Sequence, residues 1–137
     1  MNITCFDDLL QVARQQPEPQ RLLMVFVAVE LPEDSTPEQR EKFEQGLGGS
    51  FLPLARVDKT LDELSSFAQL THEASMALPD YPPWALVLVA GLSGKNGQPP
   101  SSQDAETPLQ HMVESIRAGQ VNALLPFDRD GLPVRPR

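Results

Sequence analysis

Hydrophobic residues along the chain form continuous runs, separated by polar segments with helical spacing. Two runs of strand length, Leu22–Val29 and Trp84–Ala90, are rich in valine and leucine, which is typical of strands buried on both faces. A third run, Phe51–Val57, contains Pro53, and proline favours an edge strand or a bulge because it has no N–H to donate. With a fourth run at Val121–Phe127, the pattern predicts four main strands.

Helix-start signals precede the two buried strands. Thr4 has Asp7 three residues later, and Thr60 has Glu63 at the same spacing. Both pairs fit the capping box, in which a hydroxyl and a carboxylate bind backbone N–H groups at the start of a helix. Apolar residues at helical spacing follow each pair, so the sequence predicts one helix before each buried strand.

Two further helix starts share a four-residue pattern. The segment Thr36–Gln39 reads TPEQ, and Thr107–Gln110 reads TPLQ. Threonine at the N-cap, proline at the first helical position and glutamine three residues after the cap form a strong start signal. The first of these helices is mostly charged, so we expect it to be solvated, whereas the second has the apolar spacing of a buried face.

The predicted elements come in the order helix, strand, helix, strand, and this order occurs twice. Three segment pairs also share residues: Phe6–Ala13 with Leu61–Ala68, TPEQ with TPLQ, and Leu52–Arg56 with Leu125–Arg129. We therefore expect an internal duplication, with halves at about 4–58 and 59–134. The alternative is convergent capping chemistry, since threonine-proline starts are common for physical reasons.

The length of 137 residues is typical of one domain. We expect a single compact domain over residues 1–137, with an α/β or mixed α+β fold around a four- to five-stranded sheet, because each half leaves an apolar sheet face that it cannot cover alone. A turn at Asp128–Gly131 is expected to lead into a short hairpin partner at Leu132–Val134. A pseudo-twofold axis between the halves would bring Arg56 and Arg129 to related positions.

Composition narrows the class of protein. The net charge of −8 argues against nucleic-acid binding, which needs a basic face, and against binding to an anionic membrane surface. The longest apolar run, Leu22–Leu31, has half of the ~20 residues of a membrane helix, and the start MNITCFDDLL lacks the features of a secretory signal. Cys5 is the single cysteine, which fits a reducing compartment. These features predict a cytoplasmic protein.

A glycine-rich loop, Ser93–Ser102, lies between a predicted strand and a predicted helix, an arrangement that binds phosphate in many proteins. The P-loop spacing is missing, since Gly91 and Gly94 enclose only two residues and Lys95 is followed by asparagine. We therefore favour a plain connecting loop. Ser93 and Lys95 remain candidate ligands for an anionic group.

Reactive side chains are not clustered in the sequence. His72 and His111 belong to different predicted helices and have no neighbouring cysteine, whereas metal sites need clustered ligands. We expect no metal, no cofactor and no catalytic residue, which makes an enzyme the less favoured interpretation.

Two arginines offer a different kind of candidate site. Arg56 lies at the end of a predicted strand and Arg129 just after one. Arg56 has the acidic neighbour Asp58, and Arg129 has Asp128 and Asp130, so we expect local ion pairing. The alternative is a joint site for a carboxylate or a phosphate, because guanidinium groups bind such anions through paired hydrogen bonds.

The segments PPWALVLVAGLSGKNGQPPSSQDAETPLQHMVESI and LLPFDRDGLPV resemble those of short bacterial proteins that often carry the label "ribonucleotide reductase subunit alpha". The large subunit of that reductase resembles a long barrel enzyme with a radical-bearing cysteine and a redox cysteine pair. This chain has Cys5 alone, so no catalytic residue is carried over. The resemblance implies a bacterial cytoplasmic protein.

The sequence favours a small non-catalytic protein that binds another protein or a small ligand, as a regulator. The alternative is an anion-binding protein or enzyme that uses the Ser93–Ser102 loop with Arg56 and Arg129. A third option is a homodimer formed through the strand that contains Pro53.

Overall fold

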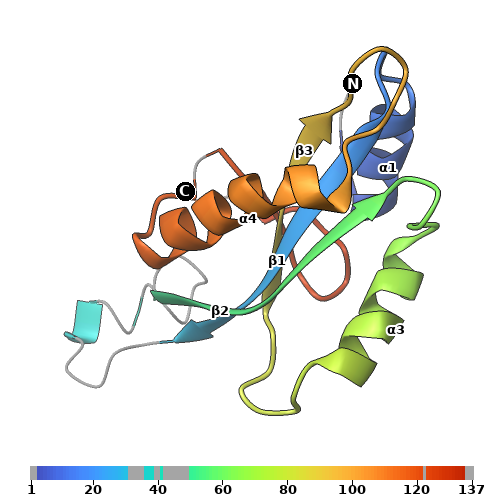
Figure 1. The fold of residues 1–137 in the computed structure, drawn as a ribbon. Helices are drawn as coiled ribbons and strands as arrows, with labels where there is room; N and C mark the ends of the chain where they lie inside the picture. The colour runs from blue at the N-terminus through green and yellow to red at the C-terminus, as the bar shows by residue number, and fades with distance from the viewer. Residues whose placement is uncertain (1–2, 31–35, 39–40, 42–49, 122, 135–137) are drawn as a thin grey trace.

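Four antiparallel strands form one sheet in the order β2-β1-β3-β4, with helices on both faces (Figure 1). The computed structural model describes residues 3–30, 36–38, 41, 50–121 and 123–134. The elements are α1 (Phe6–Arg14), β1 (Gln20–Glu30), β2 (Ser50–Thr60), α3 (Phe67–Ala77), β3 (Leu86–Ser93), α4 (Ser102–Arg117) and β4 (Leu125–Phe127). The expected mixed α/β single domain with a four- to five-stranded sheet is confirmed.

Strand β1 is apolar throughout its centre because both of its faces are covered. Leu22, Met24 and Phe26 point to one face and belong to a core with α1 and α3. Leu23 and Val25 point to the other face, where α4 covers them. The alternation of strand side chains therefore divides one apolar run between two cores.

The core on the α1 and α3 side is rich in aromatic rings. Phe6 of α1 contacts Phe127 of β4 edge to face, with ring centroids 5.3 Å apart, and Phe26 contacts Trp84 in the same way at 5.1 Å. Among the described helices, α4 is the one that covers the other face, and it lies across the front of the sheet in Figure 1. Its buried residues follow helical spacing: Ala105, Leu109, Met112 and Ile116.

Strand β2 confirms the expectation for Pro53. The strand is an edge of the sheet, and its register with β1 shifts where Phe26 faces Ala55 but Val27 faces Pro53. The last strand is shorter than expected, because β4 begins at Leu125 rather than Val121. The expected turn after β4 is present, with Phe127 bridged to Pro133.

The first helix starts differently from the prediction. Cys5 is the N-cap of α1, and the backbone N–H and the hydroxyl of Thr4 donate to the carboxylate of Asp8 rather than Asp7. Asp7 instead accepts a hydrogen bond of 2.8 Å from the backbone N–H of Phe67, the first residue of α3. One helix thus caps another, which satisfies an N–H that has no partner within its own helix.

The contact between Thr60 and Glu63 forms, but it does not start a helix. Both the N–H and the hydroxyl of Thr60 donate to Glu63, at 2.9 and 3.0 Å, in a turn after β2. Helix α3 begins later, at Phe67, after the N-cap Ser66. The expected start at Thr60 is therefore wrong by about two helical turns.

Helix α4 begins before the TPLQ signal. Ser101 and Asp104 form the capping box, and Pro108 lies inside the helix. The prediction placed the start at Thr107 and is wrong by more than one turn. In the TPEQ segment, Pro37 and Glu38 are helical and exposed; Gln39 and most of the helix expected after it lie outside the described residues.

The internal duplication is not confirmed. The strand order places β1 and β3 in the centre and β2 and β4 at the edges, as a twofold relation between halves would require. However, Phe6–Ala13 is helical, whereas most of Leu61–Ala68 is turn and loop. The matched helix starts therefore do not occupy equivalent places, and the duplication stays a prediction.

The first helix, the third helix and the final turn meet at Gly131. The backbone N–H of Phe6 donates to the carbonyl of Gly131 at 2.8 Å. Gly131 has φ +78°, and a Cβ there would lie 2.9 Å from the ring of Phe67. Glycine is required here both by the backbone conformation and by the close approach of that ring.

Candidate functional site

The glycine-rich loop contains a tight β-hairpin. Lys95 and Gln98 exchange two backbone hydrogen bonds of 3.0 Å, and the two residues between them, Asn96 and Gly97, have φ of +55° and +77°. This is the two-residue turn that Asn-Gly favours. The dipeptide is a strong hairpin signal, and the sequence analysis missed it.

The N–H groups of this hairpin already have partners. Gly94 donates to the carbonyl of Pro19 at 2.8 Å, and Gly97 donates to the carboxylate of Glu18 at 2.9 Å. A phosphate bound to the Gly97 N–H would have to displace a negatively charged group. This arrangement favours a connecting loop over a phosphate cradle.

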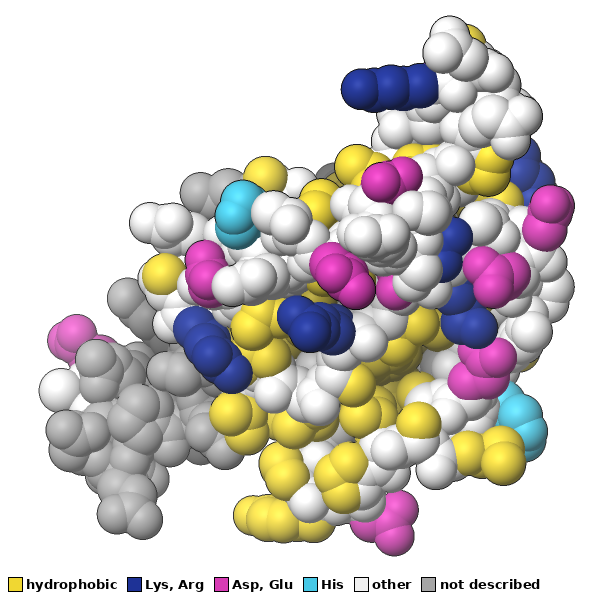
Figure 2. All heavy atoms as spheres, viewed as in Figure 1, with side chains coloured by type: hydrophobic (Ala, Val, Ile, Leu, Met, Phe, Trp, Pro, Cys, Tyr) yellow, Lys and Arg dark blue, Asp and Glu magenta, His cyan; other side chains and the backbone are white. Residues whose placement is uncertain are grey.

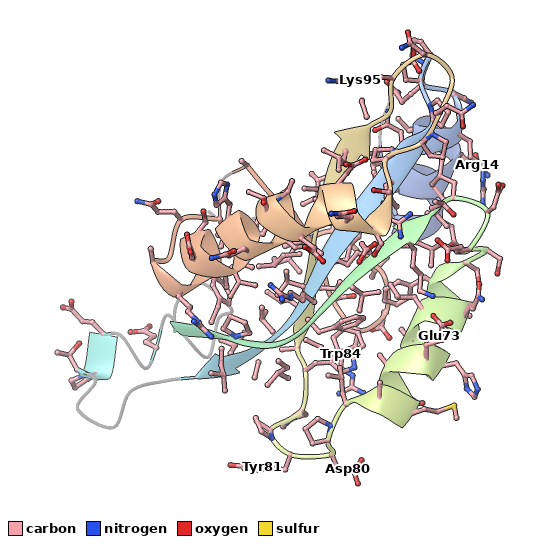
Figure 3. The ribbon with its side chains drawn as sticks, in the orientation of Figure 1. Arg14, Glu73, Asp80, Tyr81, Trp84 and Lys95 are labelled. Atoms are coloured by element: carbon pink, nitrogen blue, oxygen red, sulfur yellow. The ribbon has the colours of Figure 1, made fainter. Side chains whose placement is uncertain are left out.

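The candidate ligands of the loop are held apart. The hydroxyl of Ser93 accepts a hydrogen bond of 2.8 Å from the side chain of Gln20. Lys95 is exposed and points away from the body of the molecule at the tip of the hairpin (Figure 3). Ser93 is thus engaged with β1 while Lys95 extends into solvent.

Arg129 covers the aromatic core. Its guanidinium lies 4.9 Å from the centre of the Trp84 ring and donates a hydrogen bond of 3.2 Å to the Trp84 carbonyl. The expected ion pairs with its neighbours do not form, because Asp128 accepts the backbone N–H groups of residues 130 and 132 instead. Arg129 therefore interacts with a ring and a carbonyl rather than with a carboxylate.

Arg56 lies on the opposite face of the sheet. It pairs in register with Val25, and Val25 belongs to the core under α4. Trp84, which Arg129 covers, belongs to the other core. The structure therefore does not bring Arg56 and Arg129 into one site.

A groove of about 470 Å³ lies between β2 and α4. We call it the β2–α4 groove; its lining residues are Pro53, Leu54, Ala55, Arg56, Gln110, Val113, Glu114 and Arg117. Figure 2 shows Lys and Arg side chains beside hydrophobic surface on the face below α4. The groove combines apolar surface with positive charge, although the chain as a whole has a net charge of −8.

The two arginines of the groove have no partner among the described residues. Arg56 is on the strand wall and Arg117 on the helix wall, both are exposed, and neither forms an ion pair or a hydrogen bond with a described residue. Glu114, the acidic residue among the lining residues, contacts Gln110 at 3.4 Å. Two guanidinium groups are therefore free to bind an anionic partner.

Arg56 was a candidate from the sequence, whereas Arg117 was not. The signal was the spacing of Gln110, Val113, Glu114 and Arg117, which places these residues on one side of a helix. Nothing in the sequence indicated that this side would lie against β2, because the contact joins segments more than fifty residues apart.

At the other end of the contact between β2 and α4, polar groups are fully engaged. Arg21 is buried, and its guanidinium lies 2.6 Å from the carboxylate of Asp58. The hydroxyl of Ser102 donates to the same carboxylate at 2.7 Å, and Arg21 reaches the carbonyl of Pro100 at 3.4 Å. Asp58 thus pairs with Arg21 rather than with Arg56, so the expected local ion pair is wrong.

Lowered pKa values occur at caps and turns. Hydrogen bonds from Ser101 hold the pKa of Asp104 below its ordinary value, and those from Thr60 do the same for Glu63. Hydrogen bonds from Thr4 lower the pKa of Asp8. All three carboxylates accept backbone N–H groups, so the shifts reflect capping rather than acid–base chemistry.

The structure groups no three metal-ligating side chains among the residues it describes. His72 on α3 and His111 on α4 are both exposed. Within the same residues, no helix combines the length and the apolar character that crossing a bilayer requires.

A second, smaller hollow of about 160 Å³ lies between α1 and the sheet. Leu9, Val12 and Leu22 contribute apolar walls, and Gln16 and Gln20 contribute amide groups. It has no charged lining residue, so it offers no group that would select an ionic ligand.

Comparisons with protein-family models, with curated proteins and with solved structures find no match to the chain. The resemblance to short bacterial proteins therefore stays an expectation.

Proposed function

We propose that the protein is a non-catalytic binding protein and that the β2–α4 groove is its binding site. The observation that supports this most is the pair of arginines, Arg56 and Arg117, which line the groove from two walls and have no partner among the described residues. Exposed cations attract an anionic partner and select it by charge complementarity.

The chemistry of the groove favours binding over catalysis. A guanidinium stays protonated at neutral pH, so it donates hydrogen bonds but does not exchange protons. Among the lining residues, Glu114 is the one group that could act as an acid or a base, and none of them carries a hydroxyl or a thiol that could act as a nucleophile. We further infer a cytoplasmic location and a regulatory role, on the composition described above.

The test is a selection of peptides that bind the wild-type protein from a random library, with an Arg56→Ala/Arg117→Ala double variant as the counter-target. We expect selected peptides to bind the wild-type protein and a Lys95→Ala control equally, and the double variant weakly. If every selected peptide binds the double variant as well as the wild type, the groove is not the binding site.

Self-association through β2 is a second candidate. The strand has 11 residues and is paired on one side with β1, and open strand edges pair readily with another chain. Light scattering tests this directly, since a strict monomer at millimolar concentration would remove it. Small-anion binding at the Ser93–Ser102 loop has less support, because Glu18 occupies the N–H group that an anion would use.

A further inference from the structure

We propose that the occupant of the β2–α4 groove is an extended acidic segment of another protein, whose carboxylates bind Arg56 and Arg117. The inference rests on the proposed function, because it names the partner of that same groove. The proposed partner has a defined charge, a defined shape and a defined class, namely a polypeptide.

Charge complementarity carries the choice of an acidic partner. Arg56 and Arg117 give the groove two positive charges against one negative charge from Glu114. Carboxylates bind guanidinium groups through two parallel hydrogen bonds, which fix orientation as well as charge. The acidic residues elsewhere on the molecule are screened beyond about 8 Å at physiological ionic strength, so the local charge decides which partner binds.

The apolar surface of the groove selects an alternating pattern. Pro53 and Val113 are half-buried and line the groove together with Arg56 and Arg117, so apolar contacts lie beside the charged groups. A chain in the extended conformation places alternate side chains on one face. A segment in which acidic and apolar residues alternate therefore matches the groove better than a continuous acidic run.

The free edge of β2 favours a polypeptide over a small ligand. Among the described strands, only β1 pairs with β2, so the other side of β2 can form main-chain hydrogen bonds with an added strand. Pro53 has no N–H and the register shifts beside it, which confines such pairing to the residues around Arg56. Small-molecule sites enclose most of their ligand, whereas this groove is largely open to solvent.

A second copy of the chain fits the groove less well. In a twofold-symmetric dimer the same patch meets itself, so a contact centred on this groove would bring two Arg56 side chains and two Arg117 side chains together. Like charges at an interface oppose association. The charge of the groove therefore favours a partner with a different sequence.

The experiment uses two labelled ten-residue peptides and measures binding by fluorescence anisotropy at physiological salt. One peptide alternates glutamate with valine, and the matched control alternates lysine with valine. We expect the glutamate peptide to bind, the lysine peptide not to bind, and the Arg56→Ala/Arg117→Ala variant to bind the glutamate peptide at least about tenfold more weakly. The Lys95→Ala variant controls for the loss of a positive charge elsewhere, and thermal unfolding of each variant controls for folding.

Four results would overturn the inference. Equal binding of both peptides would remove charge as the selecting property. Displacement of the glutamate peptide by glutarate at an equal concentration would show a small anion as the occupant, and a dimer that the double arginine variant abolishes would show a second copy. If library peptides without acidic residues require both arginines, the inference fails while the proposed function stands.

Discussion

The contact between β2 and α4 has two ends, and both contain arginines. The arginine at one end is paired, whereas those at the other have no described partner. At one end, which we call the closed end, Arg21, Asp58 and Ser102 bind one another. At the other, the β2–α4 groove, Arg56 and Arg117 bind no described residue. Burial explains the difference, because a charge removed from water must find a partner, whereas an exposed charge keeps its hydration.

The closed end shows which of two arginines the carboxylate of Asp58 binds. Arg56 and Asp58 are two residues apart on the same face of β2, yet Asp58 binds the buried Arg21. A buried guanidinium gains more from a carboxylate than an exposed one does, since surface ion pairs contribute little. Arg56 therefore has no carboxylate partner among the described residues. The ion pair stabilises one end of the contact, and the arginines at the other end can bind a partner.

The largest effect is expected from breaking the closed end. Asp58→Ala should lower the free energy of unfolding by about 3 kcal/mol, because it leaves Arg21 buried without its main partner. Arg56→Ala, a substitution on the same face two residues away, should change stability by about 0.5 kcal/mol or less. Urea unfolding of both variants measures the difference, and equal losses would contradict the contrast between the two ends.

A smaller effect is expected at the helix start that supports the closed end. Ser101→Ala should cost about 1 kcal/mol, since it removes the hydroxyl that accepts the N–H of Asp104 at 3.0 Å. Gln103→Ala, an exposed substitution in the same helical turn, is the control and should be close to neutral. A loss at Gln103 as large as that at Ser101 would mean that the capping box does not stabilise the helix.

The same capping box predicts a pH dependence. Hydrogen bonds from Ser101 lower the pKa of Asp104 in the folded state. The ionised Asp104 therefore stabilises the fold above the ordinary aspartate pKa of about 3.9. This stabilisation is lost as the pH falls through the pKa of the folded state. Asp104→Asn should therefore flatten the decline of the melting temperature between about pH 5 and pH 2. Parallel profiles for the variant and the wild type would refute this.

The smallest effect on stability is expected in the groove. Glu114→Gln should change the free energy of unfolding by about 0.5 kcal/mol or less, because Glu114 is exposed and its contact with Gln110 is long. The same substitution should tighten binding of the alternating glutamate–valine peptide, since it removes the acidic residue that lines the groove together with the arginines. Weaker binding in the anisotropy assay would contradict the charge argument.

The sequence predicted the strands better than the helix starts. Continuous apolar runs located β1 and β3 because burial on both faces leaves a simple pattern. Threonine-proline signals misplaced the start of α4, since Ser101 and Asp104 offer a competing cap one turn and a half earlier. Local signals can be satisfied in turns, as Thr60 and Glu63 show, without starting a helix.

The groove could be predicted only in part. Arg56 was identified by its place after a strand, but Arg117 joins it through a contact between β2 and α4 that no local pattern reveals. The cap that Asp7 provides to Phe67 has the same character, because its donor and acceptor are sixty residues apart. Interactions of this kind depend on the packing of elements rather than on their formation.

The meeting of Phe6, Phe67 and Gly131 has a consequence for the way the molecule loses its structure. Segments from early, middle and late in the chain share one junction, so separation of any one of them removes a hydrogen bond or a ring contact from the others. Fraying that begins near either terminus should therefore spread into the layer formed by α1 and α3 as a single cooperative event. Helix α4, on the far side of the sheet, has no part in that junction and can keep its own amide protection until the sheet itself opens.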